Sequence, residues 1–410
     1  MLRLIIGGSA SGKSEYAERL VCSLPGKRIY AATMEPFGEE GRERIARHRK
    51  LREGRGFVTV EVPRELGVLA DTLRKSRAQG KVFGEEPDTE AAWEDSNTEA
   101  VSDESDTEDV REELKTGSVR KTFNILLEDL PNLVANELFA DGEIIGTDAE
   151  RAEKSDVIFS KVIRAIEELS CISENLTIVT GDIFSDGVRY DSATEEYRRL
   201  LAKINCRTAE DADQVVFVAA GCPVETDVLH GDDPCVKEKN TGTVPADFWQ
   251  KSLHSERKSG MIFVTGPLAS GKRAWVKEKL GICEENIVRA AEILRECPAE
   301  GFLQENNVQK SQELKSSKSE AACVTDVQEL VGKSSMKEEE LETLAERLSE
   351  YRAVIACEVG GGVIPLDRGE RIWRENAGRL ACRLADRAEQ VILVHCGIGI
   401  CIKPPGPKEH

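Results

Sequence analysis

The stretch Gly7-Gly8-Ser9-Ala10-Ser11-Gly12-Lys13-Ser14 decides the fold, because it follows a short apolar strand and precedes a helical pattern beginning at Glu15. It matches G-x-x-x-x-G-K-[ST] in full, a loop whose backbone N–H groups cradle phosphates. Its lysine neutralises β- and γ-phosphate oxygens, and its hydroxyl suits Mg²⁺. We therefore expect residues 7–14 to bind a nucleoside triphosphate, with Lys13 catalytic and Ser14 a metal ligand. The alternative is a glycine-rich turn without a ligand, which the strand–loop–helix context disfavours.

Short apolar segments alternate with amphipathic helical patterns around this loop. We expect strands at residues 2–6, 28–32, 123–127, 176–179 and 214–219. This alternation favours βαβ units and an α/β fold, in which a mainly parallel sheet carries helices on both faces.

The chain also contains an internal repeat. The stretch from Asp182 to Gly221 aligns without a gap on the stretch from Glu358 to Gly397, and residues 7–14 resemble residues 266–273. Two related domains are therefore fused head to tail, with fewer of the elements kept in the second. In the second loop Arg273 replaces the Mg²⁺ hydroxyl, and a guanidinium cannot ligate a cation. We expect a degenerate second copy without Mg²⁺-dependent transfer; the alternative is a loop that still holds an anion.

Composition marks the boundaries between the two copies. In residues 85–113, fourteen side chains are acidic and Arg111 is the only base. Such a segment cannot bury enough apolar surface to offset its ordering entropy. We expect a first domain at 1–226 with a disordered acidic insertion at 84–118, a linker at 227–260, and the repeat at 261–403 with a flexible insertion at 308–339. The alternative for the acidic insertion is a docking segment.

Charge and hydropathy exclude several classes of function. The formal net charge of −19 disfavours nucleic acid and anionic membrane surfaces as partners. No apolar run reaches the length of a membrane span, and the N-terminus lacks the pattern of a secretory signal. The 12 cysteines include no Cys-x-x-Cys pair. We expect a cytoplasmic protein without a membrane partner and without a zinc site.

One histidine stands in a basic cluster, Arg44-Ile-Ala-Arg47-His48-Arg49-Lys50-Leu51-Arg52. Taken alone, the cluster is typical of a solvated helix face. In an acidic protein it also suits a polyphosphate, and neighbouring cations would lower the pKa of the imidazole and leave it neutral. A neutral imidazole could attack phosphorus as a nucleophile.

Together these motifs resemble the bifunctional adenosylcobinamide kinase / adenosylcobinamide-phosphate guanylyltransferase family of cobalamin (vitamin B12) biosynthesis. The resemblance rests on the phosphate loop and on further motifs in residues 1–224: Tyr30-Ala-Ala-Thr-Met34, Arg47-His48-Arg49-x-x-Arg52, Thr59-Val60-Glu61, Leu126-Leu127-Glu128 and residues 215–221. It implies a P-loop NTPase (RecA-like) fold, ATP, GTP and Mg²⁺ as cofactors, and a homo-oligomer.

The resemblance also implies two reactions. The first phosphorylates adenosylcobinamide, and the second passes GMP from GTP to adenosylcobinamide phosphate through a covalent histidine, which by position is His48. Further nucleotide contacts would fall on Ala32, Thr33, Met34, Arg49, Lys50, Leu51, Arg52, Glu61 and Glu128. A P-loop small-molecule kinase and a GTP-binding regulatory protein without guanylyl transfer are the competing hypotheses.

The two copies differ after the fourth strand of the repeat. The family usually has Glu-Val-Gly there; the first copy has Asp182-Ile183-Phe184, and the second keeps Glu358-Val359-Gly360. The second copy has no histidine between its loop and His395, so it cannot repeat the covalent step at a matching position. Two roles for it stay open: a degenerate domain that stabilises or completes an assembly, or a corrinoid-binding half that contributes Glu358 to a shared site.

Overall fold

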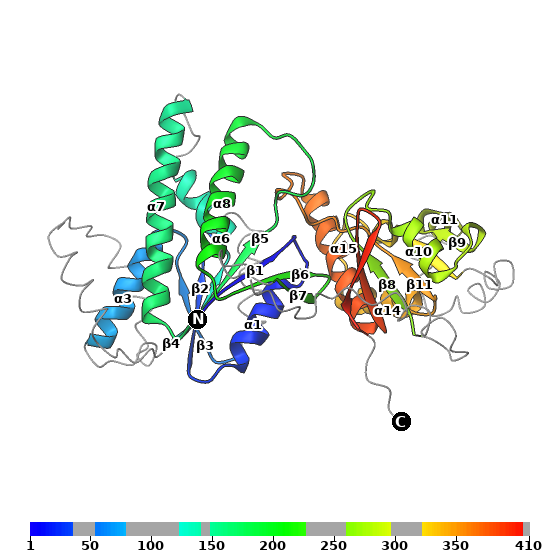
Figure 1. The fold of residues 1–410 in the computed structure, drawn as a ribbon, viewed down its shortest axis with the longest axis horizontal. Coiled ribbons are helices and arrows are strands. Elements are labelled where there is room, and N and C mark those ends of the chain that lie inside the picture. The colour runs from blue at the N-terminus through cyan, green and yellow to red at the C-terminus, as the bar shows by residue number, and fades with distance from the viewer. Residues whose placement is uncertain (36–53, 79–122, 141–147, 227–259, 297–321, 405–410) are drawn as a thin grey trace, which may run out of the picture.

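The computed structural model describes residues 1–35, 54–78, 123–140, 148–226, 260–296 and 322–404, which form two α/β units side by side (Figure 1). The acidic insertion, the linker before residue 260 and the basic cluster around His48 fall on residues outside these ranges. No helix in the described part of the chain is long and apolar enough to cross a membrane.

The first unit is built on a sheet in the order β3-β2-β4-β5-β1-β6-β7, parallel except for the last pair. Its strands are β1 (Leu2–Gly7), β2 (Lys27–Ala32), β3 (Phe57–Glu61), β4 (Phe123–Glu128), β5 (Asn175–Gly181), β6 (Gln214–Ala219) and β7 (Cys222–Thr226). Its helices are α1 (Lys13–Ser23), α3 (Leu66–Ala78), α6 (Leu130–Leu138), α7 (Asp148–Ile172) and α8 (Ser192–Asp211).

The second unit has the order β13-β12-β8-β11-β10-β9, again parallel except for the final hairpin. Its strands are β8 (Ile262–Thr265), β9 (Ile287–Arg289), β10 (Cys323–Thr325), β11 (Ala353–Ile355), β12 (Gln390–His395) and β13 (Ile398–Lys403). Its helices are α10 (Lys272–Leu280), α11 (Ala290–Glu296), α14 (Glu338–Leu348) and α15 (Arg368–Arg387), with short 3-10 turns at Glu284–Asn286 and Val327–Glu329.

The two strand orders confirm the predicted duplication. Read from the hairpin edge, β7-β6-β1-β5-β4-β2 corresponds strand by strand to β13-β12-β8-β11-β10-β9, and β3 has no counterpart among the described residues of the second unit. The long helices α8 and α15 also begin alike: Asp191 and Asp367, which match in the repeat, each accept backbone N–H groups of the first helical turn.

Helices cover both faces of each sheet, as the apolar strands require. In the first unit Leu4 faces the core beneath α3, α6, α7 and α8, whereas its neighbour Ile5 packs with Val21 of α1 on the other face. In the second unit Phe263 faces α14 and α15, and Val264 packs with Val276 of α10. Alternation along one buried strand therefore supplies both cores.

Two stretches differ from the sequence-based expectation. The proposed flexible insertion at 308–339 is wrong for residues 322–339, where β10 pairs with β9 and β11 inside the second sheet; residues 308–321 lie outside the described ranges. A strand of three residues between polar runs is too short to produce a periodic signal. The edge strands β3 and β7 were also not among the expected strands.

The two units contact each other directly. Ala220 and Cys222, at the β6–β7 hairpin, belong to the apolar core of the second unit, where they join Ala377 of α15. In return Val363, from the loop before α15, packs against the core of the first unit. Figure 1 shows α15 lying between the two sheets.

Candidate functional site

The carboxyl ends of the parallel strands gather most of the described candidate residues. Gly7 ends β1 and leads into the phosphate loop, while Glu61 and Glu128 end β3 and β4. Ala32, at the end of β2, pairs with Glu61 on one side and with Glu128 on the other. This edge is where ligands bind in open parallel sheets.

The phosphate loop has the geometry that its sequence predicts. Gly12 has a φ of 85°, a conformation that favours glycine, and an added Cβ there would lie 2.9 Å from Gly221 Cα. Helix α1 begins immediately afterwards at Lys13, so its free N–H groups face the loop. The Lys13 ammonium donates to the Gly8 carbonyl at 3.2 Å. The loop is thus shaped to receive an anion.

Ser14 and Glu128 form the central contact of the site. The Ser14 hydroxyl donates to Glu128 Oε1 at 2.5 Å. Burial, followed by the charge of Asp129, raises the pKa of Glu128 to about 7. The second carboxyl oxygen, Oε2, is buried and has no hydrogen-bond partner among the described residues. A hydroxyl beside an unsatisfied carboxylate oxygen is a donor set that suits Mg²⁺. Glu128 was expected among the nucleotide contacts and not as a metal ligand.

The side chain of Thr33, a predicted nucleotide contact, is hydrogen-bonded to the protein backbone. Its side chain is fully buried, and its hydroxyl donates to the Asp129 carbonyl at 2.7 Å while accepting the Asp129 N–H at 2.8 Å. Its flanking residues Ala32 and Met34 are partly exposed. In this structure the Thr33 hydroxyl therefore ties β2 to the turn after β4.

The predicted nucleophile and its neighbours lie outside the described residues. These are His48, Arg49, Lys50, Leu51 and Arg52. The nearest described residue downstream with a side-chain ion pair is Arg55, which binds Glu18 of α1 at 2.6 Å. Arg55, three residues after the basic cluster, therefore lies beside α1, the helix that follows the phosphate loop.

The loop at residues 266–273 keeps the backbone shape of the first loop, but its two cationic side chains bind groups of the protein itself. Gly271 has a φ of 91°, like Gly12. The buried Lys272 ammonium donates to the carbonyls of Gly266 at 3.0 Å and Pro267 at 2.5 Å. Arg273 forms an ion pair with Glu284. Both cations that could attract a phosphate are therefore engaged by the protein, as expected for a degenerate site.

The second unit borders the phosphate loop of the first. The Ser9 N–H donates to the Gly360 carbonyl at 2.9 Å, and the Ser185 N–H donates to the Gly361 carbonyl at 2.9 Å. Glu358 lies near Asp182, its match in the repeat; burial and the charge of Asp182 raise the pKa of Glu358 to about 7. Each of these two acids donates its backbone N–H to the first glycine of its own loop, Gly7 or Gly266, at 3.0 Å.

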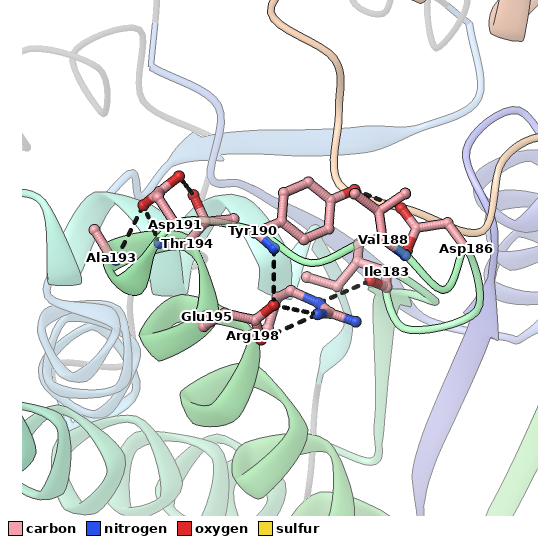
Figure 2. Close-up of polar contacts among 9 residues, drawn as sticks. All are labelled: Ile183, Asp186, Val188, Tyr190, Asp191, Ala193, Thr194, Glu195 and Arg198. Atoms are coloured by element: carbon pink, nitrogen blue, oxygen red, sulfur yellow. Dashed lines mark hydrogen bonds and ion pairs between the residues drawn. The ribbon is translucent and has the colours of Figure 1, made fainter.

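The loop between β5 and α8 is closely hydrogen-bonded where it meets the second unit (Figure 2). The Tyr190 hydroxyl donates to Asp186, and Arg198 lies 5.2 Å from the centre of the Tyr190 ring. Glu195 accepts both the Tyr190 N–H, at 3.1 Å, and Arg198. The loop that carries these contacts packs against Gly361 and Gly362 of the second unit.

A family model described as cobinamide kinase / cobinamide phosphate guanyltransferase matches residues 3–83, 97–226 and 305–402, which is well over half of the chain. The chain belongs to this family. The match includes the phosphate loop, the basic cluster and the strands that end at Glu61 and Glu128, and it extends into the second unit. A search of curated proteins found no match.

Membership of the cobinamide kinase / guanylyltransferase family makes the chain an enzyme of cobalamin biosynthesis that acts on nucleotides and cobinamides. Its α/β units are P-loop domains, as the sequence predicted. Sequence reasoning did not anticipate the hydrogen bond between Ser14 and Glu128, although an acid at the carboxyl end of a parallel strand of the same sheet could have suggested it. No motif in the sequence predicts the contact between Ser9 and Gly360.

Proposed function

We propose that the first unit phosphorylates adenosylcobinamide with ATP or GTP, and then transfers GMP from GTP to the product through a covalent GMP on His48. The observation that supports this most directly is the Ser14–Glu128 pair beside Lys13, in a chain whose family carries out both reactions. The domain limits 1–226 and 261–403 belong to the proposal, and the two sheets support them by ending at Thr226 and beginning at Ile262.

In the kinase step the loop amides and Lys13 would bind the β- and γ-phosphates. Lys13 would exchange its contact with the Gly8 carbonyl for phosphate oxygens, which are stronger acceptors because they are charged. Ser14 and Glu128 would hold Mg²⁺, which supplies charge neutralisation between phosphate oxygens. A carboxyl with a pKa of about 7 is half ionised near neutral pH and mostly ionised one pH unit higher, and a bound cation would favour the ionised form.

In the guanylyl step a ring nitrogen of His48 attacks the α-phosphorus of GTP, an N–P bond forms and pyrophosphate leaves. A phosphate oxygen of adenosylcobinamide phosphate then attacks the same phosphorus, the N–P bond breaks and adenosyl-GDP-cobinamide is released. The arginines and Lys50 beside His48 would neutralise the charge that develops on the phosphates.

The test is incubation with GTP labelled at the α-phosphate, followed by denaturation. We expect an acid-labile, alkali-stable GMP adduct in the wild type and in His395→Ala, which changes an exposed histidine of the second unit. His48→Ala should lose the adduct and retain phosphorylation of adenosylcobinamide. An adduct that persists in His48→Ala, or no adduct under conditions where GTP binds, would contradict the covalent step.

We further propose that the chains form cytoplasmic homo-oligomers. Leu268 occupies the position in the second loop that Ser9 occupies in the first, and it is 82% exposed. The first unit therefore does not cover the second loop in the way that the second unit covers the first loop. In the matching loop of the first unit, the side chains of Phe184 and Val188 stay exposed although Ser185 beside them contacts the second unit. A second copy could join these faces. The ten described cysteines, all free thiols, suit a reducing compartment.

Light scattering after size-exclusion chromatography tests the association. We expect more than one chain per particle and a shift toward the monomer in Leu268→Asp, while Leu366→Asp, at an exposed residue of a different loop, serves as the control. A monomeric wild type would contradict the oligomer.

A further inference from the structure

We propose that the second unit is a built-in clamp on the phosphate loop of the first, holding it in position for the nucleotide. The first element of the clamp is the loop after β11. The Gly360 carbonyl accepts the Ser9 N–H at 2.9 Å, and an added Cβ on Gly8 would lie 3.0 Å from the Gly360 carbonyl carbon. The backbone of one unit thus lies directly on the phosphate loop of the other.

The second element is helix α15. An added Cβ on Gly378 would lie 2.5 Å from Ala10 Cβ, so the helix surface is in full contact with the loop. One turn further along, the Cys382 thiol lies 3.7 Å from the Ala10 carbonyl, which it faces as a donor. Cys382 Sγ also lies 3.3 Å from the position that a Cβ on Gly12 would occupy. Two residues of the loop, Ala10 and Gly12, are therefore covered by one helix.

Three consecutive glycines show that the two surfaces are complementary. Gly360 lies against Ser9, Gly361 against Ser185 and Gly362 against Asp186, and an added Cβ at each would lie closer than ordinary van der Waals contact. At Gly360 the close approach to the Ser9 backbone requires glycine. At Ser9 the backbones of the two units therefore meet with no side chain between them, and Gly361 and Gly362 leave room for Ser185 and Asp186 of the neighbouring loop.

The second loop provides an internal comparison. Ala10 and Ala269, at matching positions, have φ values of 55° and 58°, although Leu268 beside Ala269 is 82% exposed. The fold therefore sets the shape of both loops without the clamp. What the clamp adds is restricted motion, which lowers the entropy cost of ordering the loop around a nucleotide. The loss of one hydrogen bond and some packing corresponds to a change in affinity of a few-fold to roughly tenfold.

The experiment uses the full chain with Gly378→Leu, and Ala202→Leu at the matching position of α8 as the control. The probe is a fluorescent GTP analogue with Mg²⁺, together with hydrogen–deuterium exchange of residues 7–14 and 266–273. In Gly378→Leu we expect roughly tenfold weaker binding and faster exchange at 7–14, with exchange at 266–273 unchanged. Ala202→Leu should bind like the wild type.

A folded Gly378→Leu variant with wild-type affinity and unchanged exchange at 7–14 would overturn the clamp. If Gly378→Leu does not fold, Cys382→Leu takes its place, with Cys206→Leu at the exposed matching cysteine of α8 as its control. These readouts require neither a cobinamide nor His48. A failure of the proposed guanylyl transfer is therefore distinguishable from a failure of the clamp.

Discussion

The hydroxyl of Ser14 donates a 2.5 Å hydrogen bond to Glu128, joining the first turn of α1 to the end of β4. One residue closes the phosphate loop and the other ends a buried strand, so the hydrogen bond links the loop to the sheet. The contact places an acid with a raised pKa beside the loop lysine, because Lys13 immediately precedes Ser14.

Glu128→Gln should separate nucleotide binding from transfer. The amide keeps the shape and can still contact Ser14, but it removes the anionic oxygen that would hold Mg²⁺. We expect nucleotide affinity within a few-fold of the wild type and a Mg²⁺-dependent transfer rate lower by about 100-fold, the size expected for one electrostatic group at a transition state. Steady-state kinetics at varied Mg²⁺ measures this, and a wild-type rate would exclude Glu128 as a metal ligand.

The two loop lysines offer a matched pair. Lys13→Ala should abolish tight nucleotide binding, because Lys13 is the loop's own cation for the β- and γ-phosphates. Lys272→Ala should leave binding unchanged, since that ammonium is buried against the carbonyls of its own loop. Isothermal titration should give one nucleotide per chain in the wild type and in Lys272→Ala. Two nucleotides per wild-type chain would show that the second loop is also functional.

Thr33→Val tests whether this residue supports the fold. The substitution leaves the buried Asp129 N–H without its acceptor, so we expect a loss of about 1–3 kcal/mol in the free energy of unfolding. Thr33→Ser keeps the hydroxyl and should recover most of that loss. Chemical denaturation measures both variants. A stable Thr33→Val variant with weakened nucleotide binding would instead favour the direct contact that the family resemblance implies.

Glu358 should make stability depend on pH. Its pKa is raised to about 7 by burial and by Asp182, so the unfolded chain releases this proton at lower pH than the folded chain does. Stability relative to Glu358→Gln should therefore fall as pH rises from about 4.5 to about 7 and stay constant above it. The full effect is on the order of 3 kcal/mol. Unfolding of both proteins between pH 5 and 9 checks this, and a pH-independent difference would contradict it.

The sequence was sufficient for the parts of the molecule that follow local rules. The phosphate loop, the five central strands of the first unit and the duplication all rest on spacing and periodicity, and each is present in the structure. The short β10 and the edge strand β7, which contains Pro223, lack the alternation that identifies a strand. They form because neighbouring strands offer hydrogen-bond partners.

The sequence identified candidate residues for the site, but it predicted only some of the contacts between them. Ser14 of the loop contacts Glu128, because the carboxyl ends of parallel strands share one edge, whereas the role of these residues in nucleotide binding stays a prediction. The burial of Thr33 could not be foreseen, since it depends on the turn after β4. Nor could the approach of Gly360 to Ser9, which joins residues far apart in the chain through a junction between two cores.

The Gly221 N–H donates to the Ser11 carbonyl at 2.7 Å, and β7 follows at once and runs to Thr226, the last described residue before the second unit. This hydrogen bond joins the phosphate loop to β7, the last described strand of the first unit. Because Ala220 and Cys222, on either side of Gly221, lie in the apolar core of the second unit, a shift of the loop on binding would be transmitted into that core.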